Sequence, residues 1–234
     1  MRMIFGIGAA GLIGWGVALA ETAPLELRGE RIALTLGREE QGAVVSLKTR
    51  EGAELAAAAQ KAPRLFALSF SQQAQVPAET LMLSSADAAA FNAEVKDDAG
   101  GPCATLIYEG FAKGVARVIC TVRVKPGDAM ARWGIRVQMQ EGWVLERVQY
   151  PFVTLAAQLG TSAEDDAAVV GSAKGGVIRK PGAMKTGTSV SVSQPGNMAA
   201  QFGCYYDDRA GFYTAAEDAR GYPKDLVLTR SASG

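Results

Sequence analysis

The residues best suited to chemistry lie in a short polar segment near the end of the chain, residues 217–225. Within it, Asp218 and Asp225 supply carboxylate acceptors, Lys224 an ammonium donor and Tyr222 an aromatic ring. Carbohydrate sites combine such groups in a concave surface. Loop residues of this kind also serve in docking one part of a protein onto another. The segment therefore predicts either a carbohydrate contact or a docking loop.

Three further aromatic residues are candidates for stacking on a sugar ring. Trp143 opens one predicted strand, and Tyr205 and Tyr206 end another. At alternating strand positions such residues are more often part of a core or an interface, so this alternative stays open.

A glycosidase would need a pair of carboxylates, because retaining enzymes hold two carboxyl groups about 5–5.5 Å apart. The acidic runs are residues 164–166, 207–208 and 217–218. Residues 207–208 fall in a predicted hairpin turn, where Asp is favoured for local hydrogen bonds. Residues 164–166 are expected to form a solvated loop; calcium binding is the alternative there, although their spacing is not that of an EF-hand loop. We predict no catalytic residue in this chain.

The complete lack of histidine excludes several active sites at once. There is no Ser-His-Asp triad, no His-activated cysteine and no H-E-x-x-H zinc site. The three cysteines, Cys103, Cys120 and Cys204, lack C-x-x-C spacing, so no metal site is predicted. Cys103 and Cys120 flank two neighbouring predicted strands and could form a disulfide; the alternative is three small buried side chains.

Two short motifs carry no function here, and no cofactor is predicted. Lys185, Thr186 and Gly187 match one box of the serine β-lactamases, but the serine motif of those enzymes is missing. Residues 6–11 match the glycine pattern of dinucleotide-binding folds. That pattern needs a strand, a helix and a second strand around it, and Pro24 followed by β-structure does not provide them.

Residues 1–20 instead predict a secretory signal peptide. Arg2 precedes an apolar stretch, and an A-x-A site ends at Ala20 before Glu21. A signal anchor is a further alternative, although the stretch is short for a membrane span. Removing Arg2 from the 24 basic residues leaves 23, against 24 acidic residues. This balance argues against nucleic acid and anionic membranes as partners, and the expected location is secreted or periplasmic.

Alternating apolar residues predict successive β-strands, typical of an all-β sandwich. We expect strands at residues 25–27, 31–36, 42–48, 65–70, 80–83, 90–95, 105–109, 115–124, 131–139, 143–150, 201–206, 211–216 and 225–228. The alanine-rich residues 54–62 are expected to be briefly helical. Residues 155–192 should hold long loops with one or two short strands. Residues 21–234 are treated as one large domain.

Several of these segments resemble the galactose-mutarotase-like supersandwich, a large antiparallel β-fold. The similarity lies in the opening strands with GAVVSL at residues 42–47, in RWGI at residues 132–135, in residues 145–152 and in the closing hairpin and loop of residues 201–224. The chain is similar to the N-terminal domain of secreted glycoside-hydrolase-like proteins, in which a TIM barrel follows. Endo-α-N-acetylgalactosaminidases share that arrangement.

The resemblance implies a non-catalytic module that braces a barrel absent from this chain and borders its carbohydrate cleft. The family's catalytic carboxylates belong to the barrel, so no residue here inherits that role. Sugar mutarotases of the same fold use a histidine, which this chain lacks. The alternatives are a stand-alone secreted carbohydrate-binding module and an exported structural or interaction protein.

Overall fold

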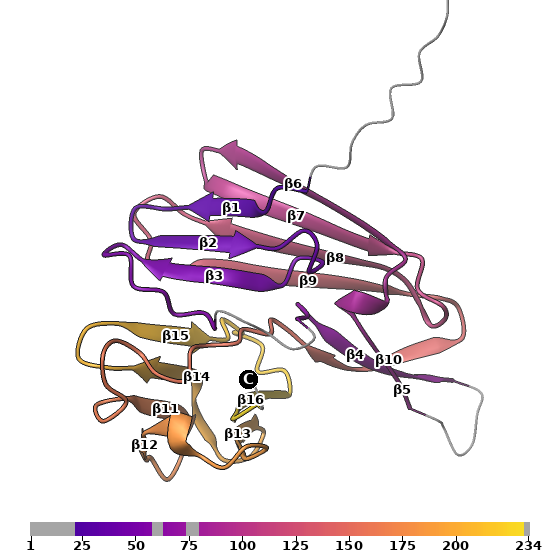
Figure 1. Cartoon of the computed structure of the whole chain (residues 1–234). Helices are drawn as coiled ribbons and strands as arrows, with labels where there is room; N and C mark the ends of the chain where they lie inside the picture. The colour runs from indigo at the N-terminus through magenta and orange to yellow at the C-terminus, as the bar shows by residue number, and fades with distance from the viewer. Residues whose placement is uncertain (1–21, 58–62, 74–79, 232–234) are drawn as a thin grey trace, which may run out of the picture.

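The computed structural model describes residues 22–57, 63–73 and 80–231, and in them the chain is built from antiparallel β-sheets (Figure 1). The predicted all-β fold class is therefore confirmed. The predicted signal peptide lies outside the described residues. None of the helices described here has the length and apolar character that a membrane span requires.

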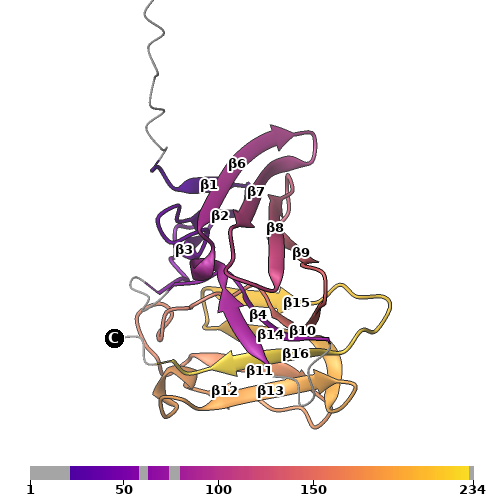
Figure 2. The same ribbon diagram turned by 90° about the vertical axis from the view of Figure 1, so that its right-hand side faces the viewer.

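Two sheets pack face to face in the upper part of Figure 1 and form a sandwich, seen edge-on in Figure 2. One sheet comprises β1 (Leu25–Arg28), β2 (Ile32–Leu36) and β3 (Val44–Thr49), and the other β6 (Ala90–Asp98), β7 (Gly101–Glu109), β8 (Val115–Val124) and β9 (Ala131–Met139). Alternate residues point inward, as a strand requires. Leu34 and Leu36 of the first sheet are buried against the second, which buries Val118, Cys120 and Val122.

A third sheet in the order β10-β4-β5 lies at one end of this sandwich. It consists of β4 (Ala67–Gln72), β5 (Leu81–Ser84) and β10 (Trp143–Gln149), and a 3₁₀ turn, η1 (Ser85–Asp87), follows β5. The connection between β9 and β10 is short, yet the two strands do not form a hairpin. β9 pairs with β8 and β10 pairs with β4. Trp143 of β10 can then pack its ring against Phe70 of β4.

The rest of the chain forms a second β-layered unit around a smaller core. One sheet comprises β11 (Ala167–Ser172), β12 (Ile178–Arg179), β14 (Met198–Tyr206) and β15 (Gly211–Ala215), and β13 (Ser189–Gln194) pairs with β16 (Lys224–Thr229). A second 3₁₀ turn, η2 (Pro181–Ala183), follows β12. The buried residues of the smaller hydrophobic core are Leu55, Leu159, Ala168 and Tyr205. Residues 155–192 thus hold three strands rather than one or two, because β11 is buried between β12 and β14.

The helix expected in residues 54–62 does not form in the described part, residues 54–57. Glu54 pairs with Lys48 and Ala56 pairs with Leu155 as isolated β-bridges. The extended backbone buries Leu55, which is 5% exposed, in the smaller core, and this burial outweighs the helix propensity of alanine. Residues 58–62 lie outside the described part. The treatment of residues 21–234 as one domain stays a prediction.

Candidate functional site

The polar loop between β15 and β16 is folded around one carboxylate. Asp218 accepts hydrogen bonds from the backbone N–H groups of Arg220 at 2.9 Å and Tyr222 at 2.7 Å. It also accepts one from Lys224 Nζ at 2.5 Å. The Lys224 bond contributes most to lowering the pKa of Asp218, and the two backbone bonds add to it, whereas desolvation opposes them. Asp218 and Lys224 thus hold the loop in shape.

Two ion pairs join this region to strands of the other sheets. Both carboxylate oxygens of Glu217 lie 2.6 Å from Arg132 Nη1 on β9. Asp225, on β16, pairs more loosely with Arg147 on β10 at 3.8 Å. Tyr222 is different, because its side chain is 59% exposed and only its hydroxyl is engaged, by Arg220 Nη1 at 3.2 Å. Figure 2 shows the loop projecting from the body of the molecule.

Two of the predicted stacking residues face inward. Trp143 packs on the larger core, with its ring centroid 5.5 Å from that of Phe70 in an edge-to-face arrangement. Tyr205 is 6% exposed and belongs to the smaller core. The ring of Tyr205 is thus buried and that of Trp143 half-buried, in line with the alternative raised for strand aromatics. Tyr206, in contrast, is exposed.

The hydroxyl of Tyr205 donates a hydrogen bond of 2.8 Å to the buried carboxylate of Asp166. Asp166 has no exposed surface, and it also accepts from the backbone N–H of Leu159 at 3.2 Å. Burial, followed by the bond to Asp166, raises the pKa of Tyr205. The expectation that Asp166 lies in a solvated loop is wrong, because pairing of β11 with β14 brings it beneath Tyr205.

The structure also reveals an aromatic surface that the sequence analysis missed in part. Phe202, Cys204 and Tyr206 are every second residue of β14 and so share one face of the sheet. Tyr213 of β15 lies opposite Cys204. We call Phe202, Tyr206 and Tyr213 the tyrosine patch. The rings of Phe202 and Tyr213 stack with centroids 5.9 Å apart and planes 20° apart. Alternation along β14 was a signal for Phe202, whereas the place of Tyr213 follows only from the strand register.

Several residues of the acidic runs bind other groups of the chain. Asp207 accepts from the backbone N–H groups of Arg209 at 2.8 Å and Ala210 at 2.6 Å, as predicted for a hairpin turn. Glu217 and Asp218 bind different cations, Arg132 and Lys224 respectively.

Asp165 lies close in space to two acidic residues that are distant from it in the sequence. Its carboxylate and those of Asp207 and Asp208 lie within 4.8 Å of one another. Asp207 and Asp208 are neighbours in the β14–β15 turn, whereas Asp165 precedes β11, so the sequence does not show that Asp165 joins them.

All three cysteines are free thiols, so the possible Cys103–Cys120 disulfide is not formed. In the ladder between β7 and β8, Cys103 lies opposite Arg123 and Cys120 lies opposite Leu106. Burial raises the pKa of Cys120 to about 12, so this thiol is kept protonated at neutral pH. The three cysteines are therefore small side chains that are at least partly buried, as in the alternative to a disulfide.

An open groove of about 620 Å³ lies beside the outer edge of β6. Its lining includes Arg38, whose guanidinium donates to the carbonyl oxygens of Ala23 and Ala93, both at 2.9 Å. Arg38 thereby covers a backbone acceptor on the edge of the sheet, which suits protection of an edge strand.

Comparisons of this chain with protein-family models, with curated proteins and with solved structures found no match.

Proposed function

We propose that this chain is a non-catalytic, exported β-module of a glycoside-hydrolase-like protein and that it contributes a carbohydrate-binding surface. The finer fold assignment, a galactose-mutarotase-like supersandwich, is part of this proposal. The sequence resemblance and the antiparallel sheets of the described residues support it.

The observation on which the carbohydrate role depends is the tyrosine patch. Tyr213 is 52% exposed and Tyr206 is 38% exposed, and in the strand register Tyr213 lies between Tyr206 and the half-buried Phe202. Aromatic rings combine a large apolar surface with, in tyrosine, a hydroxyl at the rim. The apolar face of a sugar can pack on such a ring while the phenol bonds to its hydroxyl groups.

The proposed lack of catalysis is supported by how the acidic side chains are used. Asp166 is buried under Tyr205, Asp207 orders a turn, and Glu217 and Asp218 are held by cations. A retaining glycosidase needs one carboxylate free to attack and a second free to donate a proton.

A glycan array probed with the purified chain tests this proposal, with affinities then measured by calorimetry. Replacing Tyr213 or Tyr206 by alanine should weaken binding about tenfold each, as for the loss of one stacked aromatic ring. Met82→Ala is the control, because Met82 is 69% exposed on β5, outside the patch. Equal affinity of all variants would contradict the assignment of the patch. Hydrolysis of aryl glycosides by this chain would contradict the non-catalytic role.

Docking of a neighbouring domain is the second candidate, favoured by the projecting loop of residues 216–223. Its polar groups are bonded within the chain, which leaves the ring of Tyr222 as its open apolar surface. Tyr222→Ala should leave glycan affinity unchanged if the loop serves docking. A loss as large as that of Tyr213→Ala would place the loop in the carbohydrate surface instead.

A further inference from the structure

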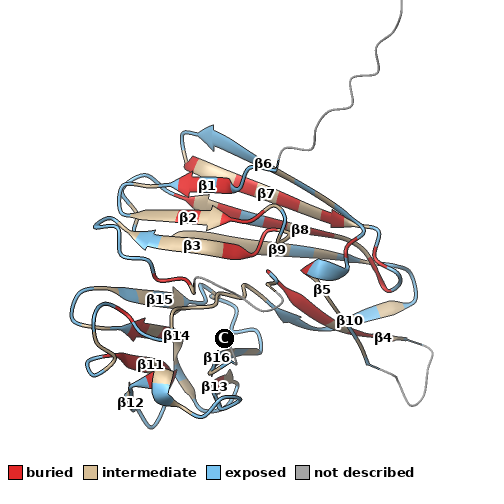
Figure 3. Cartoon of the chain, viewed as in Figure 1, coloured by how far each residue is buried: buried red, intermediate tan, exposed pale blue. Residues whose placement is uncertain are grey.

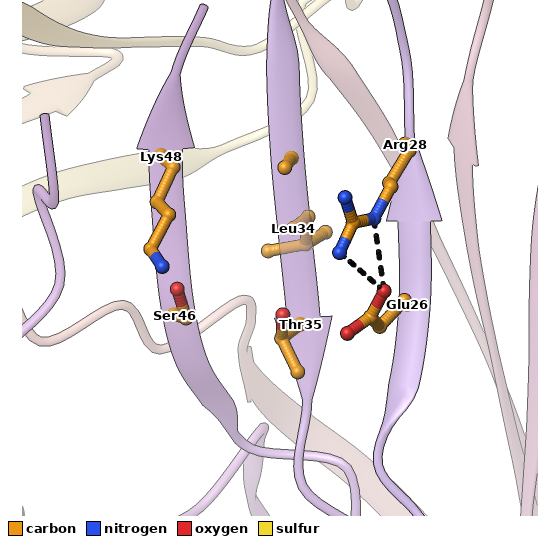
Figure 4. A pocket seen from close by; sticks show the side chains of 7 residues that line it. Glu26, Arg28, Leu34, Thr35, Ser46 and Lys48 are labelled. Carbon is orange, nitrogen blue, oxygen red and sulfur yellow. Dashed lines mark hydrogen bonds and ion pairs between the residues drawn. The ribbon is translucent and has the colours of Figure 1, made fainter. Parts of the chain in front are cut away.

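The outer face of the β1–β2–β3 sheet carries a shallow polar depression of about 160 Å³ (Figure 4). We call it the polar trough. Its floor is formed by the small residues of β2, and longer side chains from β1 and β3 form its sides. The lining residues are Glu26, Arg28, Ala33, Leu34, Thr35, Ser46 and Lys48. Figure 3 shows this sheet facing the viewer, with exposed and half-exposed positions along it.

Strand register arranges these side chains in two rows across the sheet. Arg28 lies opposite Ala33, and Ala33 lies opposite Lys48, so two cations flank a methyl group. In the neighbouring row, Glu26, Thr35 and Ser46 follow one another in the same way. The rows are about 7 Å apart, since they are two residues apart along each strand.

In the row of cations, both side chains keep hydrogen-bonding capacity. Arg28 binds Glu26 Oε2 through Nε at 2.9 Å and Nη2 at 2.8 Å, which leaves Nη1 available. Among the described residues, Lys48 Nζ has no hydrogen bond or ion pair. Its positive charge contributes to lowering the pKa of Glu54. Figure 4 shows Arg28 and Lys48 on the two strands that flank β2, with the Lys48 side chain running toward Ser46 and that of Arg28 toward Glu26.

In the other row, the acceptors are unequally occupied. Glu54 reaches this row and accepts from Ser46 Oγ at 2.5 Å, from the backbone N–H of Leu47 at 2.8 Å and from that of Ala56 at 3.0 Å. Glu26 uses only Oε2 toward Arg28, so its Oε1 remains open, and so does the hydroxyl of Thr35 among the described residues. The trough thus offers two cationic donors in one row and a carboxylate and a hydroxyl in the next.

We propose that the polar trough binds an acidic saccharide, with a carboxylate or sulfate group above β2 between Arg28 and Lys48. Arginine and lysine are the side chains that bind such oxyanions. Neighbouring hydroxyl groups of the sugar then donate to Glu26 Oε1 and bond to Thr35. The proposal rests on the proposed carbohydrate function and adds a ligand class and a second contact surface, separate from the tyrosine patch.

Calorimetry with the full chain at low ionic strength tests the proposal. The probes are a trigalacturonate, a sulfated disaccharide, an uncharged trigalactoside and inorganic sulfate. The acidic saccharides should bind at least about tenfold more tightly than the uncharged one, because charge-assisted hydrogen bonds are the strong ones. Arg28→Gln and Lys48→Gln should each weaken that binding about tenfold.

Matched variants separate a defined site from general charge attraction. Arg136→Gln removes an exposed arginine on β9 and Lys113→Gln an exposed lysine, both outside the trough, and neither should change affinity. Ala33→Leu keeps every charge but fills the floor between the cations, so it should abolish binding of the acidic probes. A thermal melt of Ala33→Leu confirms that the variant is folded.

Three results would overturn the inference. Equal affinity for uncharged and acidic saccharides, unaffected by the trough variants but lost in Tyr213→Ala, would leave the proposed function standing and remove the trough. Inorganic sulfate binding as tightly as the sulfated disaccharide would identify a simple anion site. Failure of every saccharide to bind would count against the proposed function itself.

Discussion

The Asp166–Tyr205 pair shows how much depends on a single buried carboxylate. Asp166 has no exposed surface, and its bonds come from one hydroxyl and one backbone N–H. A buried polar group that loses its hydrogen-bond partner destabilises the fold by its full desolvation free energy. Tyr205 is therefore a structural residue whose hydroxyl matters as much as its ring.

We predict that Tyr205→Phe lowers the free energy of unfolding by about 1–3 kcal/mol, because it leaves Asp166 with one partner fewer. Urea denaturation measures this. Tyr213→Phe is the control, since that hydroxyl lies on the exposed face and has no hydrogen bond to another described residue. Its effect should stay within about 0.5 kcal/mol. Equal stability of both variants would show that Asp166 does not need the tyrosine.

We predict that the stability of the fold depends on pH in the acid range because of Asp218. Its pKa in the fold lies below the ordinary value of 3.8, chiefly through Lys224. The carboxylate therefore stabilises the fold above that value, and the contribution is lost as the pH falls through the folded-state pKa. Asp218→Asn should consequently lose less stability than the wild type between about pH 5 and about pH 2.5.

Urea denaturation at both pH values measures the difference, with Asp97→Asn as the control. Asp97 is exposed on β6 and has no bond to another described side chain. An Asp218→Asn variant with the same acid sensitivity as the wild type would show that the pair with Lys224 contributes nothing to folding.

At the scale of elements, the β7–β8 hairpin depends on a glycine at its closing turn. Gly114 has φ of +82°, a conformation that residues with a side chain rarely adopt. A Cβ atom there would overlap the ring of Phe70. The hairpin therefore combines a backbone requirement with close packing against the neighbouring sheet.

Gly114→Ala should lower the free energy of unfolding by about 2–4 kcal/mol, from the strained backbone together with overpacking of the core. Gly127→Ala is the matched control in the β8–β9 turn. Its φ is +71°, but a Cβ atom there would meet nothing within 4 Å. Only the backbone cost, about 1 kcal/mol, should remain. Equal losses in urea denaturation would show that the contact with Phe70 relaxes freely.

At the scale of the molecule, the two cores share one side chain among the residues that the structure describes. Leu47 of β3 packs against both the larger and the smaller hydrophobic cluster. The pair of Arg132 with Glu217 adds a polar link between β9 and the loop that follows β15. That pair is largely exposed and contributes little, so the apolar contact is the stronger connection.

We predict one unfolding transition for the wild type, with coincident midpoints by fluorescence of Trp133 and Trp143 and by far-ultraviolet circular dichroism. Both tryptophans report on the larger core. Leu47→Ala should lower the free energy of unfolding by about 1–2 kcal/mol, less than a fully buried leucine, and should separate the two midpoints. Separate midpoints already in the wild type would show that the cores unfold independently.

The sequence alone determined the all-β class and most strand positions, because alternation of apolar residues has a period that only a strand with one buried face satisfies. β8, with Val118, Cys120 and Val122 on one side, is the clearest case. The turn role of Asp207 was also predictable, since it depends on its immediate neighbours.

Only the tertiary structure decided which strands pair and which side chains meet. Although the β9–β10 connection is short, β10 pairs with β4 and not with β9. Burial of Asp166 and exposure of Tyr213 follow from the register of β14 with its neighbours. The physical reason is that periodicity records which residues are buried, whereas pairing depends on contacts between distant segments, which leave no local pattern.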